Sequence, residues 1–339
     1  MKAIYITKFG TTAEAFEFRD IEIPPPGDHE VCIKVSASGL NFADIMMRKG
    51  LYADSPEPPF IPGYDVEGTV HAVGAKVSDF KPGDRVFAMT PFGGYAEYVK
   101  TSARGVAKLP SGAEPGTGTA LATQYSTAYY AAEIAQTLTA GEIVLVHAAA
   151  GGVGTALVQL CKRRGCTVIG LASTEKKIKY LESLGVDFPI RHTKVDFARE
   201  VENHYGRRKI SAYFDNLGGK SIRKGKSLLM PGGRIISFGA ASLTSNSIFD
   251  KLRLLLGFGW FSPISYLQKS QSFIGVNMLR LAMYKPELLG QVLKEVGACY
   301  ERGEIRPTIG KIFPANHVGE AHKFMESRQS IGKNVIVWE

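Results

Sequence analysis

A glycine-rich segment near the middle of the chain constrains its fold most strongly. It reads His147-Ala-Ala-Ala-Gly-Gly-Val-Gly, follows an apolar strand-like run at 143–146, and leads into a helical pattern. In this order of strand, glycines and helix, backbone N–H groups and the helix dipole can bind a pyrophosphate. The order predicts a dinucleotide-binding turn with contacts from Gly151, Gly152 and Val153. A generic turn between a strand and a helix is the alternative.

The segment after the next strand indicates which dinucleotide binds. An NAD-binding unit usually carries Asp or Glu at the end of this strand, where it binds the ribose hydroxyls. Here the strand-like run 166–171 leads to Ser173 and Thr174, with Lys176 and Lys177 close behind. Hydroxyls and lysines suit a 2′-phosphate, which a carboxylate would repel, so we predict NADPH rather than NADH. The negative charge of Glu175 does not fit a phosphate site. The alternative interpretation is that the two lysines form a solvated pair on a surface helix.

The composition favours a globular enzyme with two domains. A chain of 339 residues is long for one compact core. The first residues lack the apolar stretch of a secretory signal, so we expect a cytoplasmic protein. The four cysteines form no Cys-x-x-Cys pair, which argues against a structural zinc site. The net charge of +9 suits an anionic cofactor, but no dense basic run with interleaved aromatic residues indicates nucleic-acid binding.

The pattern of apolar residues changes after the first third of the chain. Residues 30–38 alternate apolar and polar side chains as a half-buried strand does, and further strands are expected at 66–70 and 95–99. From about Thr123, strands alternate with helices, the mark of a parallel doubly wound sheet. Later strands of that sheet are expected at 213–215 and 235–238.

Several motifs occur in a specific order over nearly the whole chain. They lie at residues 39–44, 48–52, 62–74, 83–86, 127–129 and 215–219, together with the glycine turn. This collection resembles the zinc-independent quinone oxidoreductases of the medium-chain dehydrogenase/reductase superfamily, and among them the vesicle amine transport protein homologues. The resemblance implies an α/β fold with a GroES-like β-rich catalytic domain, residues 1–123 and 279–339. This domain is split around an inserted Rossmann domain, residues 124–278.

The resemblance also implies a site without a metal. Alcohol-oxidising relatives place a cysteine ligand near the position of Asn41 and a His-Glu pair where Tyr64-Asp65 stands. Alcohol oxidation without a metal lacks the Lewis acid that stabilises an alkoxide. Hydride transfer to a quinone or an activated enone needs no metal, because the acceptor itself delocalises the charge onto an oxygen that a hydrogen-bond donor can stabilise.

Site residues follow from the resemblance position by position. Asn41 and Tyr52 match residues that line the nicotinamide and acceptor cleft, and we predict both as catalytic. Thr127, Asn216, Asn334 and the backbone at Phe238 and Gly239 are assigned to the cofactor, chiefly its nicotinamide side. Ser173, Lys177 and Arg328 match contacts to the 2′-phosphate. His192 replaces a tyrosine of that set, and it or the neighbouring Arg191 could still pair with phosphate.

Two of these assignments have structural alternatives. Asn41 is also a favourable N-cap for a helix that starts at Phe42. Tyr52 is either a hydrogen-bond donor to the acceptor or a packing residue. In other members a second tyrosine can stand where this chain has Met46. Its absence leaves no obvious general acid pair, so the proton is expected from solvent.

The proposed reductase function does not explain why the segment 248–268 is apolar. The segment is too short and too broken to span a bilayer, which needs about 20 apolar residues. Three interpretations remain open: a lid over an apolar acceptor site, a dimer contact, or a membrane-surface element in which Lys251 and Arg253 meet headgroups. Exposed apolar surface of this size predicts that something covers it.

The sequence therefore predicts an NADPH-dependent, zinc-independent reductase of a quinone or an activated enone. Reduction of enoyl thioesters is an alternative in the same enzyme class. A nucleotide-binding, membrane-associated lipid-handling module without turnover is an alternative of another class. The resemblance implies a homodimer, with an edge strand at 273–276 as the expected contact, and peripheral membrane contact is the less favoured partner prediction.

Overall fold

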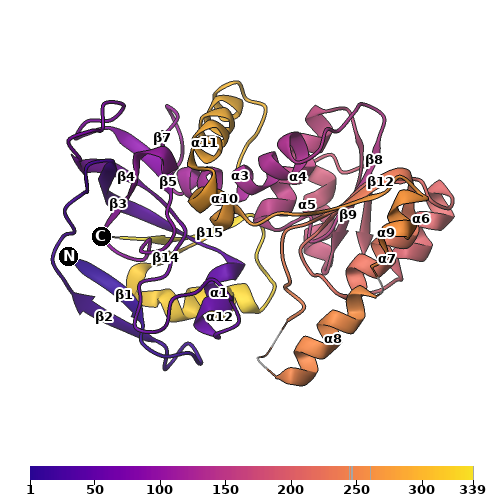
Figure 1. The fold of residues 1–339 in the computed structure, drawn as a ribbon, viewed down its shortest axis with the longest axis horizontal. Helices are drawn as coiled ribbons and strands as arrows, with labels where there is room; N and C mark the ends of the chain where they lie inside the picture. The colour runs from indigo at the N-terminus through magenta and orange to yellow at the C-terminus, as the bar shows by residue number, and fades with distance from the viewer. Residues whose placement is uncertain (244, 246, 260, 339) are drawn as a thin grey trace. The chain divides into compact units, whose positions relative to one another are not determined.

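The computed structural model describes residues 1–243, 245, 247–259 and 261–338. These residues form two compact units. Unit 1 comprises Met1–Ser126 and the residues from Met278 onward, and unit 2 comprises Thr127–Asn277 (Figure 1). The two-part fold predicted from the sequence, a β-rich domain and a doubly wound parallel sheet, is confirmed.

Unit 1 is built on an antiparallel sheet. Within the described residues its strand order is β14-β15-β3-β4-β5-β7, with β6 paired to β3, and only β14 and β15 run parallel. A separate hairpin, β1 and β2, covers one side (Figure 1). The strands are β1 (Lys2–Ile6), β2 (Phe16–Asp20), β3 (Glu30–Leu40), β4 (Asp65–Val73), β5 (Arg85–Met89), β6 (Tyr98–Ser102), β7 (Val106–Lys108), β14 (Ile309–Pro314) and β15 (Lys333–Val337). The helical segments are α1 (Phe42–Arg48), η1 (Ala103–Gly105), α2 (Thr117–Thr119), η2 (Ala120–Tyr125), α10 (Met278–Tyr284), α11 (Pro286–Glu301), η4 (Ala315–His317) and α12 (Val318–Glu326).

Unit 2 is built on a parallel sheet with the strand order β10-β9-β8-β11-β12-β13 among its described residues. Its strands are β8 (Ile143–Val146), β9 (Thr167–Ala172), β10 (Phe188–Arg191), β11 (Ile210–Asp215), β12 (Leu229–Ser237) and β13 (Ser272–Gly275). Its helices are η3 (Tyr130–Ile134), α4 (Gly152–Arg163), α5 (Glu175–Ser183), α6 (Phe197–Tyr205), α7 (Lys220–Leu228), α8 (Ile248–Phe258) and α9 (Pro263–Leu267), and α3 (Ser126–Tyr129) leads into the unit.

The strand order of unit 2 reverses direction next to β8. The chain moves outward from β8 to β9 and β10, then returns to β11 on the other side of β8. Right-handed crossovers therefore place α4 and α5 on one face of the sheet and α6 and α7 on the other (Figure 1). Ligands of doubly wound sheets bind at the carboxyl ends of the strands beside such a reversal. In this chain that position is occupied by the glycine turn after β8.

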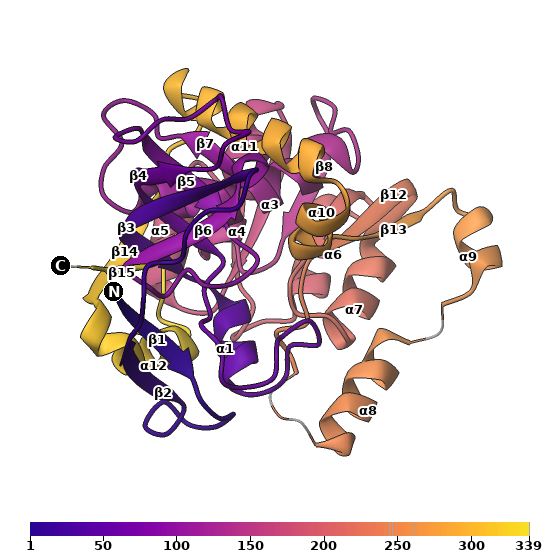
Figure 2. The same ribbon diagram turned by 60° about the vertical axis from the view of Figure 1, so that its left-hand side comes forward.

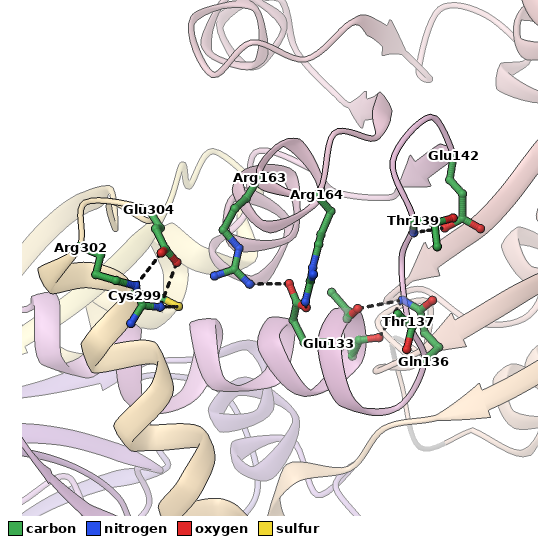
Figure 3. Close-up of polar contacts among 12 residues, drawn as sticks. Glu133, Gln136, Thr137, Thr139, Glu142, Arg163, Arg164, Cys299, Arg302 and Glu304 are labelled. Atoms are coloured by element: carbon green, nitrogen blue, oxygen red, sulfur yellow. Dashed lines mark hydrogen bonds and ion pairs between the residues drawn. The ribbon is translucent and has the colours of Figure 1, made fainter.

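A buried carboxylate holds the C-terminal end of α4 in place. Glu133, on η3, is only 4% exposed and accepts hydrogen bonds from Arg163 Nη2 at 2.7 Å and Arg164 Nε at 2.8 Å (Figure 3). The two arginines also oppose the negative end of the helix dipole. No local sequence pattern indicates this pairing, because Glu133 and the arginines are 30 and 31 residues apart. The pairing of Glu133 with the two arginines helps to position the glycine turn, because α4 begins at that turn.

The apolar segment 248–268 forms two short helices, α8 and α9, between β12 and β13. Both figures show α8 extending away from the sheet of unit 2 (Figures 1 and 2). Residue 260 of this segment lies outside the described residues. No helix in the described part of the chain is both long enough and apolar enough to cross a membrane.

Candidate functional site

The glycine turn after β8 is tightly folded. Ala148 adopts a positive φ of 50°, and its carbonyl accepts a hydrogen bond from the Gly151 N–H at 2.9 Å. A Cβ atom at Gly154 would lie 2.2 Å from the same carbonyl oxygen, a distance that no side chain tolerates. The third glycine of the motif is therefore required by the close approach of the first turn of α4 to the loop.

The start of α4 is suited to an anion. Gly151 is its N-cap residue and supplies no side chain to the helix end. The first N–H groups of a helix have no partner within the helix, and they carry the positive end of its dipole. Gly151, Gly152 and Val153 are all partly exposed. The backbone at these three predicted residues is thus accessible to a pyrophosphate.

Three residues predicted to bind the 2′-phosphate side follow neighbouring strands of unit 2. Ser173 follows β9, and Lys177 lies in the first turn of α5, which Thr174 caps. His192 follows β10, and its N–H donates to the Ala172 carbonyl at 3.1 Å. The parallel pairing of β9 and β10 thus brings the three residues to one edge of the sheet.

Glu175, whose charge does not fit a phosphate site, has a basic partner in this structure. Its carboxylate forms an ion pair with Arg191 Nη1 at 3.7 Å. This pairing reduces the negative charge that Glu175 would present to a phosphate. It also engages Arg191, which is the predicted alternative to His192 as a phosphate partner.

Three further predicted residues of unit 2 directly follow the strands β11 and β12, across the point where the strand order reverses. Asn216 follows β11, and a Cβ atom at Gly239 would lie 2.8 Å from the Asn216 carbonyl oxygen. Phe238, at the end of β12, donates its N–H to the Asp215 carbonyl at 3.0 Å. Thr127 is buried in α3. Asn216, Phe238 and Gly239 are therefore close to one another.

A buried polar cluster behind the glycine turn was not identified from the sequence. His147 Nδ1 lies 3.1 Å from the Tyr213 hydroxyl and 3.0 Å from the Ser221 hydroxyl, and Tyr213 donates to Asp215 at 2.7 Å. Burial, assisted by the nearby His192, lowers the pKa of His147 to about 3. His147 is therefore neutral at physiological pH. Its partners are 66 and 74 residues distant, so local sequence patterns give no signal for them.

In unit 1, Asn41 belongs to a fully buried polar network. It is the N-cap residue of α1, as one of the two sequence interpretations proposed, and its N–H donates to Asp44 Oδ2 at 2.7 Å. Its amide donates to Asp65 Oδ1 at 3.0 Å and accepts from Lys333 Nζ at 2.9 Å. Lys333 and Asp65 also form an ion pair, with both side chains completely buried. The amide retains one N–H for a further partner.

Two tyrosines lie close together near this network. The rings of Tyr52 and Tyr64 have centroids 6.1 Å apart, and the buried Tyr64 hydroxyl forms no well-aligned hydrogen bond with a described residue. Burial raises the pKa of both hydroxyls, so each remains a neutral hydrogen-bond donor at physiological pH. Burial also raises the pKa of Asp44 to about 7.

The last two predicted residues lie in the C-terminal part of unit 1. Asn334 is buried on β15, where its amide accepts from the Lys311 N–H at 3.0 Å and donates to Ser330 at 2.9 Å. Arg328 is exposed after α12 and adopts a positive φ of 57°. Internal hydrogen bonds thus engage Asn334, and Arg328 lies in a tight turn.

Among the described residues, no group of three or more His, Cys, Asp and Glu side chains could hold a metal ion. The cysteines at 32, 161, 166 and 299 are all buried as free thiols.

Comparisons with known proteins agree with this architecture. Residues 27–111 match the family model of the alcohol dehydrogenase GroES-like domain, and residues 152–288 match the zinc-binding dehydrogenase model. The human quinone oxidoreductase is 34% identical over 99% of this chain and 98% of its own length. The human synaptic vesicle membrane protein VAT-1 homolog is 33% identical over 99% of this chain and 86% of its own length. A mycobacterial protein solved in complex with NADPH superimposes with a TM-score of 0.85, at 29% identity, over 100% of both chains.

Proposed function

We propose that this chain, which belongs to the quinone oxidoreductase family of the medium-chain dehydrogenase/reductase superfamily, uses NADPH to reduce a quinone or an activated α,β-unsaturated carbonyl. It is an oxidoreductase by family membership. The observation that carries the proposal is the uncapped start of α4 beside the reversal of strand order, because an anionic dinucleotide binds there in doubly wound sheets.

The residues of unit 2 fit a nicotinamide dinucleotide with a 2′-phosphate. Backbone N–H groups at Gly151, Gly152 and Val153 would bind the pyrophosphate. Ser173 and Lys177 would bind the 2′-phosphate, and His192 lies beside them. The nearby Glu175 is paired with Arg191, which reduces its repulsion of the phosphate. The mycobacterial structure with NADPH supports this choice. The assignments of Arg328, Thr127 and Asn334 stay predictions.

When bound, the nicotinamide supplies a hydride. The residues of unit 1 would orient the acceptor and stabilise its oxygen. The raised pKa of Tyr52 keeps its hydroxyl protonated, so it would serve as a neutral hydrogen-bond donor. Hydrogen bonds with Asp65 and Lys333 fix the orientation of the Asn41 amide and thus the direction of its remaining N–H. A fixed donor costs little reorganisation when negative charge develops on the acceptor oxygen. With no acid assigned to the acceptor carbon, the proton would come from solvent.

Titration of NADPH and NADH by fluorescence quenching tests the cofactor proposal. Lys177→Ala removes one charged contact to the 2′-phosphate and is expected to weaken NADPH binding roughly 10- to 100-fold, in the range of hydrogen bonds to charged groups. NADH binding should change little. Lys176→Ala, an exposed lysine on the same helix, is the matched control and should leave both affinities unchanged.

Two results would contradict the proposal. If Lys177→Ala weakens both nucleotides equally, the 2′-phosphate assignment is wrong. If the wild-type protein binds neither nucleotide, the glycine turn is only a structural turn, and a lipid-handling module becomes the better interpretation. After NADPH binding is established, steady-state assays with quinones, enones and crotonyl-type thioesters would separate the proposed acceptors from the enoyl-thioester alternative.

A further inference from the structure

The loop that carries Tyr52 has no regular structure of its own. Residues 49–59, all of which the structure describes, form neither a helix nor a strand. The loop runs from the end of α1 to Phe60, which pairs with Ile6 as an isolated bridge. Within the loop, the Ser55 N–H donates to the Tyr52 carbonyl at 3.1 Å and closes a tight turn. Contacts with other elements therefore determine how firmly the Tyr52 side chain is held.

The helix α10 supplies such contacts through two consecutive residues. Leu279 is buried and belongs to the apolar cluster against which Tyr52 packs. Its neighbour Arg280 forms an ion pair with Asp54, which lies two residues after Tyr52. Asp54 and Arg280 are 226 residues apart in the chain, so no local pattern links them. One helix thus contacts the loop both through an apolar side chain and through a charged one.

The ion pair has a two-point geometry. Arg280 Nη2 donates to Asp54 Oδ1, and Arg280 Nε donates to Asp54 Oδ2 at 3.3 Å. The Asp54 side chain is only 15% exposed, whereas that of Arg280 is 52% exposed. Two parallel N–H groups on the two oxygens of a carboxylate fix the direction of the contact as well as its length. Exposed ion pairs usually contribute little to stability, but one with this geometry can orient a loop.

The pair also affects the electrostatics at Tyr52. Burial is the largest cause of the raised pKa of the Tyr52 hydroxyl, the Asp54 carboxylate raises this pKa further, and the Arg280 guanidinium lowers it. The two charges of the pair therefore oppose each other at this hydroxyl. Without the opposing charge of Arg280, the carboxylate of Asp54 would disfavour the negative charge that develops on an acceptor oxygen beside Tyr52.

We propose that Arg280 and Asp54 are positioning residues, which hold the Tyr52 loop against α10 and so direct the Tyr52 hydroxyl towards the acceptor oxygen. This inference rests on the proposed reductase function, in which Tyr52 is a hydrogen-bond donor to the acceptor. A donor that is fixed before the reaction stabilises developing charge without reorganisation. A loop that is held less firmly displaces this donor, and a misplacement of about 1 Å can lower a rate roughly 100-fold.

The rate of NADPH oxidation in a single turnover with 1,4-naphthoquinone tests the role of the pair in the reaction. Arg280→Gln should lower this rate roughly tenfold, and the Kd of NADPH, measured by fluorescence quenching, should not change. Tyr52→Phe removes the donor and should lower the rate roughly 100-fold. Because Arg280 acts through Tyr52, the double variant Arg280→Gln/Tyr52→Phe should be no slower than Tyr52→Phe alone.

Arg302→Gln is the matched control for the removal of a half-exposed arginine. Arg302 is 51% exposed, lies in the same unit, and donates to both carboxylate oxygens of Glu304. This variant should oxidise NADPH at the wild-type rate, because neither residue of this pair contacts the Tyr52 loop.

Hydrogen exchange of the backbone amides between residues 51 and 57 tests the contact itself, without any acceptor. Arg280→Gln should speed this exchange at least roughly fivefold, because the loop opens more often. The charge-exchanged variant Asp54→Arg/Arg280→Asp restores an ion pair of opposite direction. It should exchange more slowly than Arg280→Gln and oxidise NADPH faster.

Three results would overturn the positioning role while the reductase function stands. The first is wild-type hydrogen exchange in Arg280→Gln, which would show that the pair does not hold the loop. The second is an equal fall of the rate on Arg280→Gln with and without the Tyr52 hydroxyl, and the third is a wild-type rate in Tyr52→Phe. A wild-type protein that binds no NADPH or reduces no acceptor would instead contradict the proposed function, and the positioning role would fail with it even if the hydrogen exchange responds as expected.

Discussion

Replacing Lys333 with methionine should strongly destabilise unit 1. The ammonium group is completely buried, pairs with Asp65, and donates to Asn41 at 2.9 Å. Methionine keeps most of the volume but removes the charge. Among the described residues, the Asp65 carboxylate then retains only the Asn41 amide as a side-chain donor. Breaking a buried ion pair by removing one partner typically costs about 3–5 kcal/mol. This is a large part of the roughly 5–15 kcal/mol by which most domains are stable.

The double variant Lys333→Met/Asp65→Asn isolates the electrostatic contribution. It removes both charges and keeps an acceptor for the Asn41 amide, so it should recover at least about 2 kcal/mol relative to Lys333→Met alone. Lys34→Met, an exposed lysine on β3 of the same sheet, is the matched control and should change stability by less than about 0.5 kcal/mol.

Urea unfolding followed by far-ultraviolet circular dichroism measures these differences for the wild type, for the three variants and for Asp65→Asn alone. A loss of less than about 1 kcal/mol in Lys333→Met would show that the buried pair contributes little. A double variant as unstable as the sum of the single variants would show that the two side chains act independently. Either result would refute the interpretation of Asn41, Asp65 and Lys333 as one electrostatic unit.

Two further predictions concern unit 2 and the buried histidines. Gly154→Ala places a Cβ atom 2.2 Å from the Ala148 carbonyl oxygen, so it should displace the turn and weaken NADPH binding at least roughly tenfold in the same titration, and unchanged affinity would contradict the required close approach. Burial lowers the pKa of His147 and His322 to about 3, below the usual 6.5, so their contribution to stability is present above pH 6.5 and is lost as the pH falls towards 3. His322→Phe should therefore flatten the acid side of the curve of melting temperature against pH, and a variant with the wild-type acid slope would contradict this assignment.

The local parts of the fold were predictable from the sequence because neighbouring residues determine them. Apolar runs gave the strands at 143–146 and 213–215, and the glycines between a strand and a helix gave the turn. The alternation at 30–38 correctly predicted β3, although the strand continues to Leu40. The strand expected at 95–99 forms later, at Tyr98–Ser102, because Tyr95 and Ala96 pack against β1.

The contacts that fix the candidate site were less predictable because they join distant parts of the chain. Lys333 and Asp65 are 268 residues apart, and no periodic pattern links them. Arg163 lies in a run of three basic residues at 162–164, which is typical of a solvated helix end, yet it binds the buried Glu133. For the segment at 248–268, the sequence identified the apolar residues but could not show which side of α8 its own unit covers.

The buried network around Asn41 occupies the positions at which metal-dependent relatives are expected to bind their metal, and its chemistry fits the proposed metal-free reaction. Asn41 and Asp65 stand where alcohol-oxidising relatives are expected to carry metal-binding and supporting residues, and here both bind the ammonium of Lys333. A divalent cation beside this ammonium would meet a like charge in a completely buried region, where solvent screens charges weakly. The ammonium of Lys333 can fix the orientation of the neutral Asn41 amide. Unlike a catalytic zinc ion, it offers no open coordination position to an alkoxide. Such a site is suited to an acceptor that already carries its own electron-withdrawing carbonyl, as quinones and enones do.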